Sequence, residues 1–225
     1  MGTAYNANIV TDGLVLCLDA ANPRSYPGSG TTWYDLSGNG NNMTGGIHPS
    51  FLYFYDENCG LFRFSGSKFS SSLTTTSLGL SNDSGATISN WLKIDLLNRW
   101  TGVIAFWSSA GYARFGWDIT PANELRIWKN NSISTSISLS NYDNKWIYYS
   151  LVSNSSGTIF YVNNDVLTTT SQAGNIGADS RTLMFGQHWD NGIRGDGSIL
   201  KIYNKALSQQ EIRQNFNATR GRYGI

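Results

Sequence analysis

Strand-like runs recur along this chain, and each is rich in β-branched and aromatic residues. Apolar and polar positions alternate within the runs, and clusters of Gly, Asn, Asp and Ser separate them, which is the pattern of strands joined by turns. In KWIYYSLV (145–152), one face is predicted to hold Trp146, Tyr148, Ser150 and Val152, and the other Ile147, Tyr149 and Leu151. Turn residues on both sides of GTIFYV (157–162) predict two hairpins. About ten to twelve strands of this length predict an all-β fold, a sandwich of two antiparallel sheets.

A single helix is predicted, at the C-terminal end. Ser208 and Glu211 have the spacing of a capping box, in which each residue satisfies a backbone N–H of the other. Ile212 and Phe216 lie four residues apart and therefore share one helix face. Gly221 is expected to end the helix. We favour a short helix that docks on the sandwich over one that binds a partner.

No linker divides the chain. Residues 1–12 have weak strand patterning and are predicted to form an N-terminal arm, followed by one domain over residues 13–225. The first residues lack a basic segment followed by an apolar run, so no signal peptide is predicted. No segment is long and apolar enough to span a membrane. The protein is therefore expected to be made in a cytoplasm.

Composition narrows the classes of partner. The formal net charge is +1 among 225 residues, so no electrostatic field favours nucleic acid or an anionic membrane. Charged residues make up only 14%, against roughly 25% in typical domains, and neutral polar residues replace them. Such a surface suits viral, extracellular or sugar-binding β proteins. Cys17 and Cys59 are too few for a disulfide framework, and a buried free thiol is predicted for Cys17, with a Cys17–Cys59 disulfide as the alternative.

The stretch TTWYDLSGNGNN (31–42) has two interpretations. Its oxygen-bearing side chains follow the spacing of a calcium loop, with ligands at Asp35, Ser37, Asn39 and Asn41. The bidentate glutamate of such a loop should then fall at position 46, which is a glycine. Asp35 can instead bond to its own backbone in an Asx-turn, and we favour this turn interpretation. Calcium remains the alternative, with a further carboxylate from Asp19 or Asp56.

The loop Gln187–Gly192 is the candidate for a sugar site, although we favour a core position for any single tryptophan of the chain. Lectin sites combine an aromatic platform with a few amide or carboxylate groups, and this loop offers Trp189, Asp190 and Asn191. Tyr112 and Trp117 are further aromatic candidates. The competing interpretation is that these tryptophans belong to the core, because large sandwiches bury most of their tryptophans.

Catalysis has little support in the sequence. Glycoside hydrolysis needs two carboxylates that flank the scissile bond. The glutamates lie in unrelated segments, although Asp118 and Glu124 could converge across a hairpin. Arg194-Gly195-Asp196 spells a cell-adhesion tripeptide, which we interpret as a chance match in a Gly-rich turn. The protein is therefore not expected to be an enzyme.

Four segments together resemble one family. They are GLVLCLDAANPRSYPGSGTTWYDLSGNGNN (13–42), ATISNWLKI (86–94), GTIFYVNNDVL (157–167) and GSILKIYNKALSQQEIRQNFNATRGRYG (197–224). In that order they resemble the laminin-G-like branch of the concanavalin A-like lectin/glucanase superfamily, and more narrowly its members in virion proteins of tailed bacteriophages. The resemblance implies a jelly-roll sandwich. It does not imply one activity, because a fold of this kind carries lectins, hydrolases and structural parts alike.

The resemblance and the missing catalytic pair together predict a non-catalytic virion structural protein, in a capsid decoration or in a tail or fibre. The alternative is a carbohydrate-binding module for host-surface glycans, and a glycoside hydrolase is a remote third. The expected partners are other virion proteins, further copies of the chain in the particle, and surface glycans. The expected location is the virion.

Overall fold

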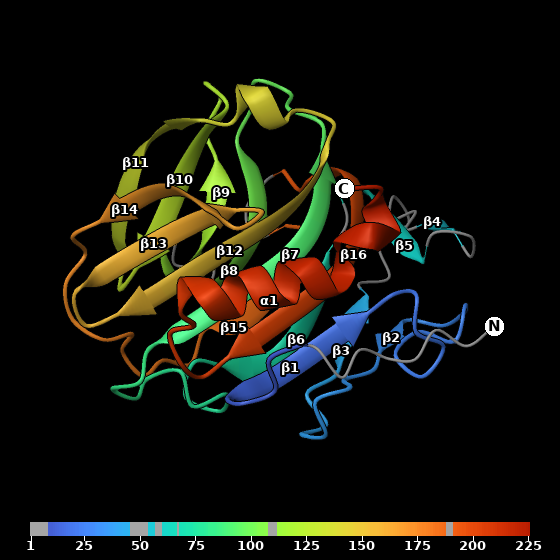
Figure 1. Ribbon diagram of the computed structural model, residues 1–225, viewed down its shortest axis with the longest axis horizontal. Coiled ribbons are helices and arrows are strands. Elements are labelled where there is room, and N and C mark those ends of the chain that lie inside the picture. Colours follow the sequence, from blue (N-terminus) through green and yellow to red (C-terminus); the bar gives the residue numbers. More distant parts are fainter. Residues whose placement is uncertain (1–8, 46–53, 57–59, 67, 108–111, 188–190) are drawn as a thin grey trace.

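The computed structural model describes residues 9–45, 54–56, 60–66, 68–107, 112–187 and 191–225 (Figure 1). Two antiparallel sheets pack face to face. The first sheet runs in the order β14 (Asp165–Thr170), β13 (Gly157–Val162), β12 (Trp146–Asn154), β7 (Ala86–Ile94), β16 (Arg194–Tyr203), β5 (Leu61–Ser65) and β4 (Phe54–Asp56), and β1 (Leu14–Asp19) also pairs with β16. The second sheet runs in the order β11 (Ser132–Ser138), β10 (Glu124–Lys129), β9 (Ala113–Ile119), β8 (Thr101–Trp107), β15 (Thr182–Phe185), β6 (Phe69–Thr74), β3 (Met43–Gly45) and β2 (Thr32–Trp33).

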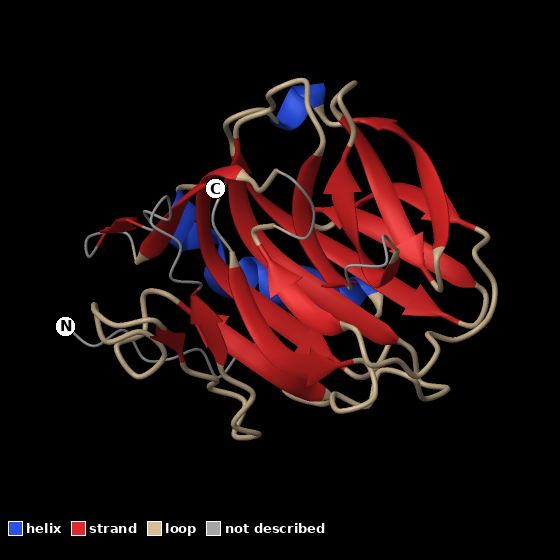
Figure 2. Ribbon diagram, turned by 180° about the vertical axis from the view of Figure 1, so that it is seen from behind, coloured by secondary structure: helices blue, strands red, loops and turns tan. Residues whose placement is uncertain are grey.

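The predicted two-sheet antiparallel sandwich with a C-terminal helix is confirmed (Figure 2). The described ranges hold sixteen strands rather than ten to twelve, because β2, β3, β4 and β15 have only two to four residues each. Runs this short carry no alternation signal in the sequence. The two predicted hairpins are present, with β13 pairing with β12 on one side and β14 on the other.

The main core lies between the sheets, where side chains from both inner faces interdigitate. Trp33 from the second sheet packs against Phe62 from the first with ring centroids 4.9 Å apart, and against Phe69 at 5.1 Å. The alternation predicted in β12 is confirmed. One set of its apolar side chains lies in this core, namely Ile147, Tyr149 and Leu151. Tyr148 and Val152 lie in a second cluster on the outer face of the first sheet.

Helix α1 (Gln209–Thr219) covers that outer face (Figure 1). It begins with the predicted capping box, in which the Ser208 hydroxyl accepts from the Glu211 N–H and the Glu211 carboxylate accepts from the Ser208 N–H at 2.8 Å. Ile212 and Phe216 are buried against the sheet, so the docking interpretation is confirmed. No helix in the described part of the chain is long and apolar enough to cross a membrane.

The C-terminal end of the helix differs from the expectation. Helix α1 is followed directly by the 3-10 helix η2 (Arg220–Tyr223). Gly221 lies within η2 and therefore does not end the helical region. The glycine that ends the helical region is Gly224, with a φ of 71°. Tyr223 stacks on Trp91 with ring centroids 4.0 Å apart, and this contact keeps the last turn against the sheet.

Part of the predicted N-terminal arm is bound to the domain. Val10 is buried, its N–H donates to the Asn215 side chain at 2.9 Å, and its carbonyl accepts from the Tyr203 hydroxyl at 3.1 Å. Residues 1–8 lie outside the described residues. Cys17 is a buried free thiol, as predicted, and burial raises its pKa to about 11. Cys59, its alternative disulfide partner, also lies outside the described residues.

Candidate functional site

Four loops interlock at one end of the sandwich, which we call the loop end. They are the connections 95–100, 120–123 and 139–145 and the described ends, 186–187 and 191–193, of the connection between β15 and β16. Asn98 and Asn123 join the first two, because the Asn98 N–H donates to the Asn123 side chain at 3.2 Å and the Asn123 amide donates to the Asn98 side chain at 2.6 Å. Both residues have positive φ, 50° and 58°, which asparagine tolerates better than most residues.

The remaining two loops are fixed to the same assembly. The Leu96 N–H donates to the Asp143 carboxylate at 2.8 Å. Arg99 donates to the Gly192 carbonyl at 3.0 Å and to the Asn191 side chain at 3.3 Å. Burial, and secondarily the nearby positive charge of Arg194, lowers the pKa of Arg99. The loop end is therefore a cross-linked surface rather than a set of independent loops.

An exposed tryptophan lies at the loop end with its ring held from behind. Trp100 is 44% exposed, and the guanidinium carbon of Arg126 lies 4.2 Å from its ring centroid. Arg126 donates to both oxygens of Asp118 at 2.6 and 2.7 Å, and the Trp128 indole donates to Asp118 at 2.8 Å. Asp118 and Arg126 meet because they are partners in the β9–β10 register and point to the outer face of the second sheet.

This arrangement can present a rigid aromatic face to solvent. Arg126 and Asp118 are both buried and neutralise each other, so the support behind the ring carries no net charge. A guanidinium packed against an indole is attracted by the ring quadrupole, by about 0.5–2 kcal/mol depending on its desolvation. The same loops carry the side-chain amides of Asn98, Asn123 and Asn191, groups that can both donate and accept hydrogen bonds.

The structure separates the residues predicted for a sugar site. Asn191 lies at the loop end, where its carbonyl accepts from the Gly102 N–H at 2.9 Å. Tyr112 is 53% exposed, but it precedes β9 and so lies at the opposite end of the β8–β9 pair. Trp189 and Asp190 lie outside the described residues.

The prediction of Trp117 as a sugar contact is wrong. Its side chain is 1% exposed and packs in the core against Tyr149 and Phe160, at centroid distances of 5.0 and 5.2 Å. Along β9, Phe115 and Ile119 point the same way as Trp117, whereas Asp118 points outward. Trp100 was not predicted from the sequence. The pattern that could have identified it is its position after the Asn98 turn and directly before a strand.

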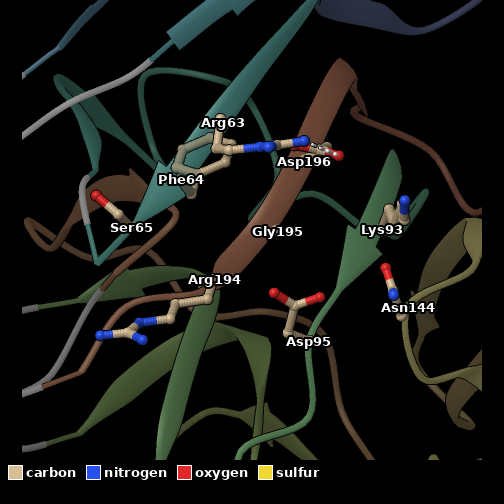
Figure 3. Close-up of a pocket in the computed structure, with 9 residues that line it drawn as sticks. All are labelled: Arg63, Phe64, Ser65, Lys93, Asp95, Asn144, Arg194, Gly195 and Asp196. Atoms are coloured by element: carbon tan, nitrogen blue, oxygen red, sulfur yellow. Dashed lines mark hydrogen bonds and ion pairs between the residues drawn. The ribbon is translucent and has the colours of Figure 1, made fainter.

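A polar cavity of about 390 Å³ borders the same loops (Figure 3). Its walls come from the ends of β5, β7 and β16 and from the loop before β12, and they comprise Arg63, Phe64, Ser65, Lys93, Asp95, Asn144, Arg194, Gly195 and Asp196. Arg63 donates to both oxygens of Asp196 at 2.7 and 3.1 Å. Gly195 is required there, because with its φ of 134° a Cβ would lie 1.9 Å from the Lys93 carbonyl oxygen.

The tripeptide Arg194-Gly195-Asp196 begins strand β16 and does not form the Gly-rich turn that the sequence predicted. Asp196 is 5% exposed and is bonded to Arg63. An adhesion motif needs its carboxylate available to a partner, so this environment supports the interpretation of the tripeptide as a chance match.

The stretch 31–42 is hydrogen-bonded to strand β1, and its side-chain oxygens do not converge as the ligands of a metal ion would. Both Asp35 carboxylate oxygens are already hydrogen-bonded, one to the N–H groups of Cys17 and Ser37 and the other to the Asn41 N–H and the Ser37 hydroxyl. The bond to Ser37 N–H is the predicted Asx-turn. Within the described ranges, no group of three or more His, Cys, Asp or Glu side chains could hold a metal ion.

The other candidate ligands of this loop cover the free edge of β1. The Asn39 amide donates to the Leu14 carbonyl at 3.3 Å, and the Asn41 amide donates to the Val15 carbonyl at 2.7 Å. Unpaired strand edges are templates for aggregation, and proteins cover them with loops of this kind. The hydrogen bonds therefore support the turn interpretation over the calcium loop.

Replacing Asp35 with alanine should destabilise the fold without involving a metal. The variant leaves the buried Cys17 N–H and two loop N–H groups without their acceptor, so we expect a loss of about 2–4 kcal/mol in the free energy of unfolding. The melting temperature should fall by roughly 5–10 °C in a domain of this size. In the wild type, a chelator should leave the melting temperature unchanged. Saturating calcium at 100 times its dissociation constant would add about 2.7 kcal/mol, so a shift of several degrees on chelation would establish a metal site instead.

Comparison with known proteins places this architecture in a family. The model of the family described as the concanavalin A-like lectin/glucanases superfamily, laminin G type, matches residues 65–213. No curated protein sequence matches the chain. Solved structures match this fold at low sequence identity. Such a likeness shows the fold alone.

Three of these structures indicate the range of relatives. A sialidase of Trypanosoma rangeli in complex with sialic acid is 14% identical, with a TM-score of 0.66, over 98% of this chain and 34% of its own. The binding domain of Paraclostridial mosquitocidal protein 1 is 20% identical, with a TM-score of 0.67, over 92% and 52%. The ligand-binding domain of botulinum neurotoxin serotype D in complex with N-acetylneuraminic acid is 18% identical, with a TM-score of 0.64, over 92% and 51%. The chain thus spans about a third of the sialidase and about half of the toxin domains. The family model matches about two thirds of the chain. This match shows that the chain belongs to the concanavalin A-like lectin/glucanase superfamily, in its laminin G-like branch.

Proposed function

We propose that this chain binds carbohydrate at its loop end, with the Trp100 ring as the platform. The observation that carries the proposal is an exposed indole fixed by a buried guanidinium, which is itself clamped by Asp118. A sugar presents a face of C–H groups that can pack on an aromatic ring. A ring held in place before binding loses little conformational freedom when the ligand arrives, and this lowers the cost of association.

The surrounding amides suit the hydroxyl groups of a sugar. Ligand sites generally combine apolar contact with a few fixed polar groups that set orientation. Asn98, Asn123 and Asn191 are such groups, since each is anchored by a hydrogen bond and an amide has capacity for more than one. The sialidase structure and the botulinum neurotoxin structure named above contain sialic acid and N-acetylneuraminic acid, respectively, so sialylated glycans are reasonable first probes.

Trp100→Ala should remove most of the binding. Stacking on an aromatic ring is worth about 1–3 kcal/mol by alanine substitution, a figure measured for planar bases, and we expect the lower half of that range for sugars. The affinity should therefore fall about five- to thirtyfold. The measurement is a glycan array probed with a multivalent form of the protein, because many weak sites acting together give a readable signal.

Two matched variants make the array decisive. Trp100→Phe keeps a ring at the same place and should retain part of the binding. Tyr112→Ala removes an equally exposed ring at the far end of the strand pair and should change nothing. An array that is silent for the wild type would refute carbohydrate binding, and binding that survives in Trp100→Ala would place the site elsewhere, for example in the connection that holds Trp189.

We further propose that the site binds without catalysis. Asp118, one of the two carboxylates that the sequence placed near each other, is bonded to Arg126 and Trp128. A general acid or nucleophile must reach the scissile bond, and this carboxylate faces its own ion pair instead. Glycans bound on the array should therefore be recovered unhydrolysed, and release of a reducing end would contradict the proposal.

A role in the virion of a tailed bacteriophage is a second proposal, and it is compatible with the first. Its support is the resemblance of the opening segment 13–42 and the closing segment 197–224 to such proteins. A particle that carries many copies could use sites of millimolar affinity. Imaging of a particle with this chain on its surface would test the proposal, and the chain's absence from purified particles would end it.

A further inference from the structure

A second cavity, of about 550 Å³, lies far from the loop end, beside strands β1 and β16 and the C-terminal turn. It is within the size range of small-molecule sites, which is roughly 300–1,000 Å³. Much of its wall is apolar, with Ile9, Leu14, Leu36 and Ile199 among the lining side chains. We call it the Lys201 cavity, after the residue that makes it unusual.

Lys201 lines this cavity without a hydrogen-bond partner. Its side chain comes from β16, directly opposite Cys17 in the β1–β16 register, and the residue is 3% exposed. The ammonium nitrogen is buried and, within the described part of the chain, has no hydrogen-bond partner. A buried ammonium without a partner costs several kcal/mol, so proteins that keep one usually have a use for it.

The neighbouring charges do not satisfy Lys201. Asp19 is the nearest carboxylate, but both of its oxygens accept from Arg222, at 2.7 and 2.9 Å, and one also accepts from the Ala21 N–H. Cys17, with its raised pKa, is neutral near pH 7. Arg24 adds a further positive charge among the lining residues. The cavity therefore holds three cationic side chains and one carboxylate.

The chain's own N-terminal segment cannot supply the missing anion. Ile9 lines the cavity, and the residues before it read MGTAYNAN, which contains no aspartate or glutamate. Among the described lining residues Asp19 has the one carboxylate, and Arg222 occupies it, so a ligand can supply the carboxylate for Lys201. The apolar part of the wall, which includes Leu14, Leu36 and Ile199, fits an acid whose remaining atoms are hydrocarbon better than it fits a polyhydroxylated sugar.

We propose that the Lys201 cavity binds a small apolar carboxylic acid, whose carboxylate accepts from the Lys201 ammonium and whose hydrocarbon part contacts Leu14 and Ile199. The site is separate from the proposed carbohydrate site and does not depend on it. Burial lowers the pKa of Lys201, with Cys17 and Asp19 acting in the opposite direction and Arg222 in the same direction. A bound carboxylate favours the protonated amine, so binding should weaken as the pH rises.

Calorimetric titration of the full chain with octanoate tests the proposal. We expect saturable binding that weakens as the pH rises. Octanol has the same tail without the charge and should bind at least tenfold more weakly. Lys201→Met keeps the length of the side chain and removes the ammonium, so octanoate affinity should fall at least tenfold, while the unliganded variant should melt no lower than the wild type.

Two further variants keep the test decisive. Lys145→Met removes an exposed lysine that does not line the cavity and should leave octanoate binding unchanged. Thr11→Trp places a bulky ring at an exposed lining position and should block octanoate without unfolding the chain, which covers the case of a Lys201→Met variant that fails to fold. The proposal is overturned if octanoate does not bind, if octanol binds equally well, if Lys201→Met or Thr11→Trp folds and still binds octanoate like the wild type, or if N-acetylneuraminate is bound here in place of octanoate.

Discussion

Asp118→Ala should lower the free energy of unfolding by about 3–5 kcal/mol, the range for breaking a buried ion pair by removing one partner. The variant removes the carboxylate that accepts two hydrogen bonds from the Arg126 guanidinium, which is 7% exposed, and it removes the acceptor of the Trp128 indole. In a domain of this size the melting temperature should drop by roughly 10 °C. Denaturant unfolding followed by tryptophan fluorescence measures both quantities.

Two comparisons isolate the cause. Asp12→Ala breaks an ion pair with Lys205 in which the aspartate side chain is 82% exposed, and exposed pairs contribute only about 0–1 kcal/mol. The double variant Asp118→Leu with Arg126→Met removes both charges and should recover much of the stability, because an apolar pair leaves no charge unpaired. A loss below 1 kcal/mol for Asp118→Ala would mean that water reaches the pair.

The Asp118→Ala variant also connects stability with the proposed function. Trp100 is held by Arg126, and Arg126 is held by Asp118. Freeing the guanidinium should loosen the ring and weaken sugar binding even at temperatures where Asp118→Ala is folded. Tyr112→Ala, which touches none of these residues, should leave both stability and binding near the wild-type values.

The sequence predicted the parts of this fold that have local causes. The capping box at Ser208 depends on two residues three positions apart, and the facing of β12 depends on alternation within a single strand. The neighbours of a strand depend on the whole chain. β1 pairs with β16, from the opposite end of the sequence, and no local pattern in either strand specifies that partner.

The candidate site was harder to predict because both faces of β9 are buried. Trp117 faces the core, and its neighbour Asp118 is 2% exposed on the outer face, so burial does not follow polarity along this strand. Trp100 and Trp117 have the same side chain. Only the register of β9 against β10 shows that Arg126 lies behind Trp100, whereas Trp117 lies in the core. Lys201 was missed for a similar reason, since a lysine within an alternating strand is ordinarily solvated.

Phe216→Ala should cost about 3–5 kcal/mol, the usual range for truncating a buried phenylalanine. Phe216 is 5% exposed and packs on Trp91 and Tyr148, with ring centroids 5.7 and 6.2 Å apart. Its removal leaves a cavity between helix α1 and the outer face of the first sheet. Because this helix also holds Val10 through Asn215, we expect the N-terminal segment to become accessible to protease in the same variant.

The control is an exposed position one turn earlier on the helix. Arg213 is exposed, and Arg213→Ala should change the stability by less than about 0.5 kcal/mol, as for most surface substitutions. A binding helix would show the reverse pattern, with little loss of stability in Phe216→Ala and a loss of partner in Arg213→Ala. We expect the first pattern, because the Trp91 indole donates to Thr219 at 2.8 Å and the helix is thereby bonded to the sheet as well as packed on it.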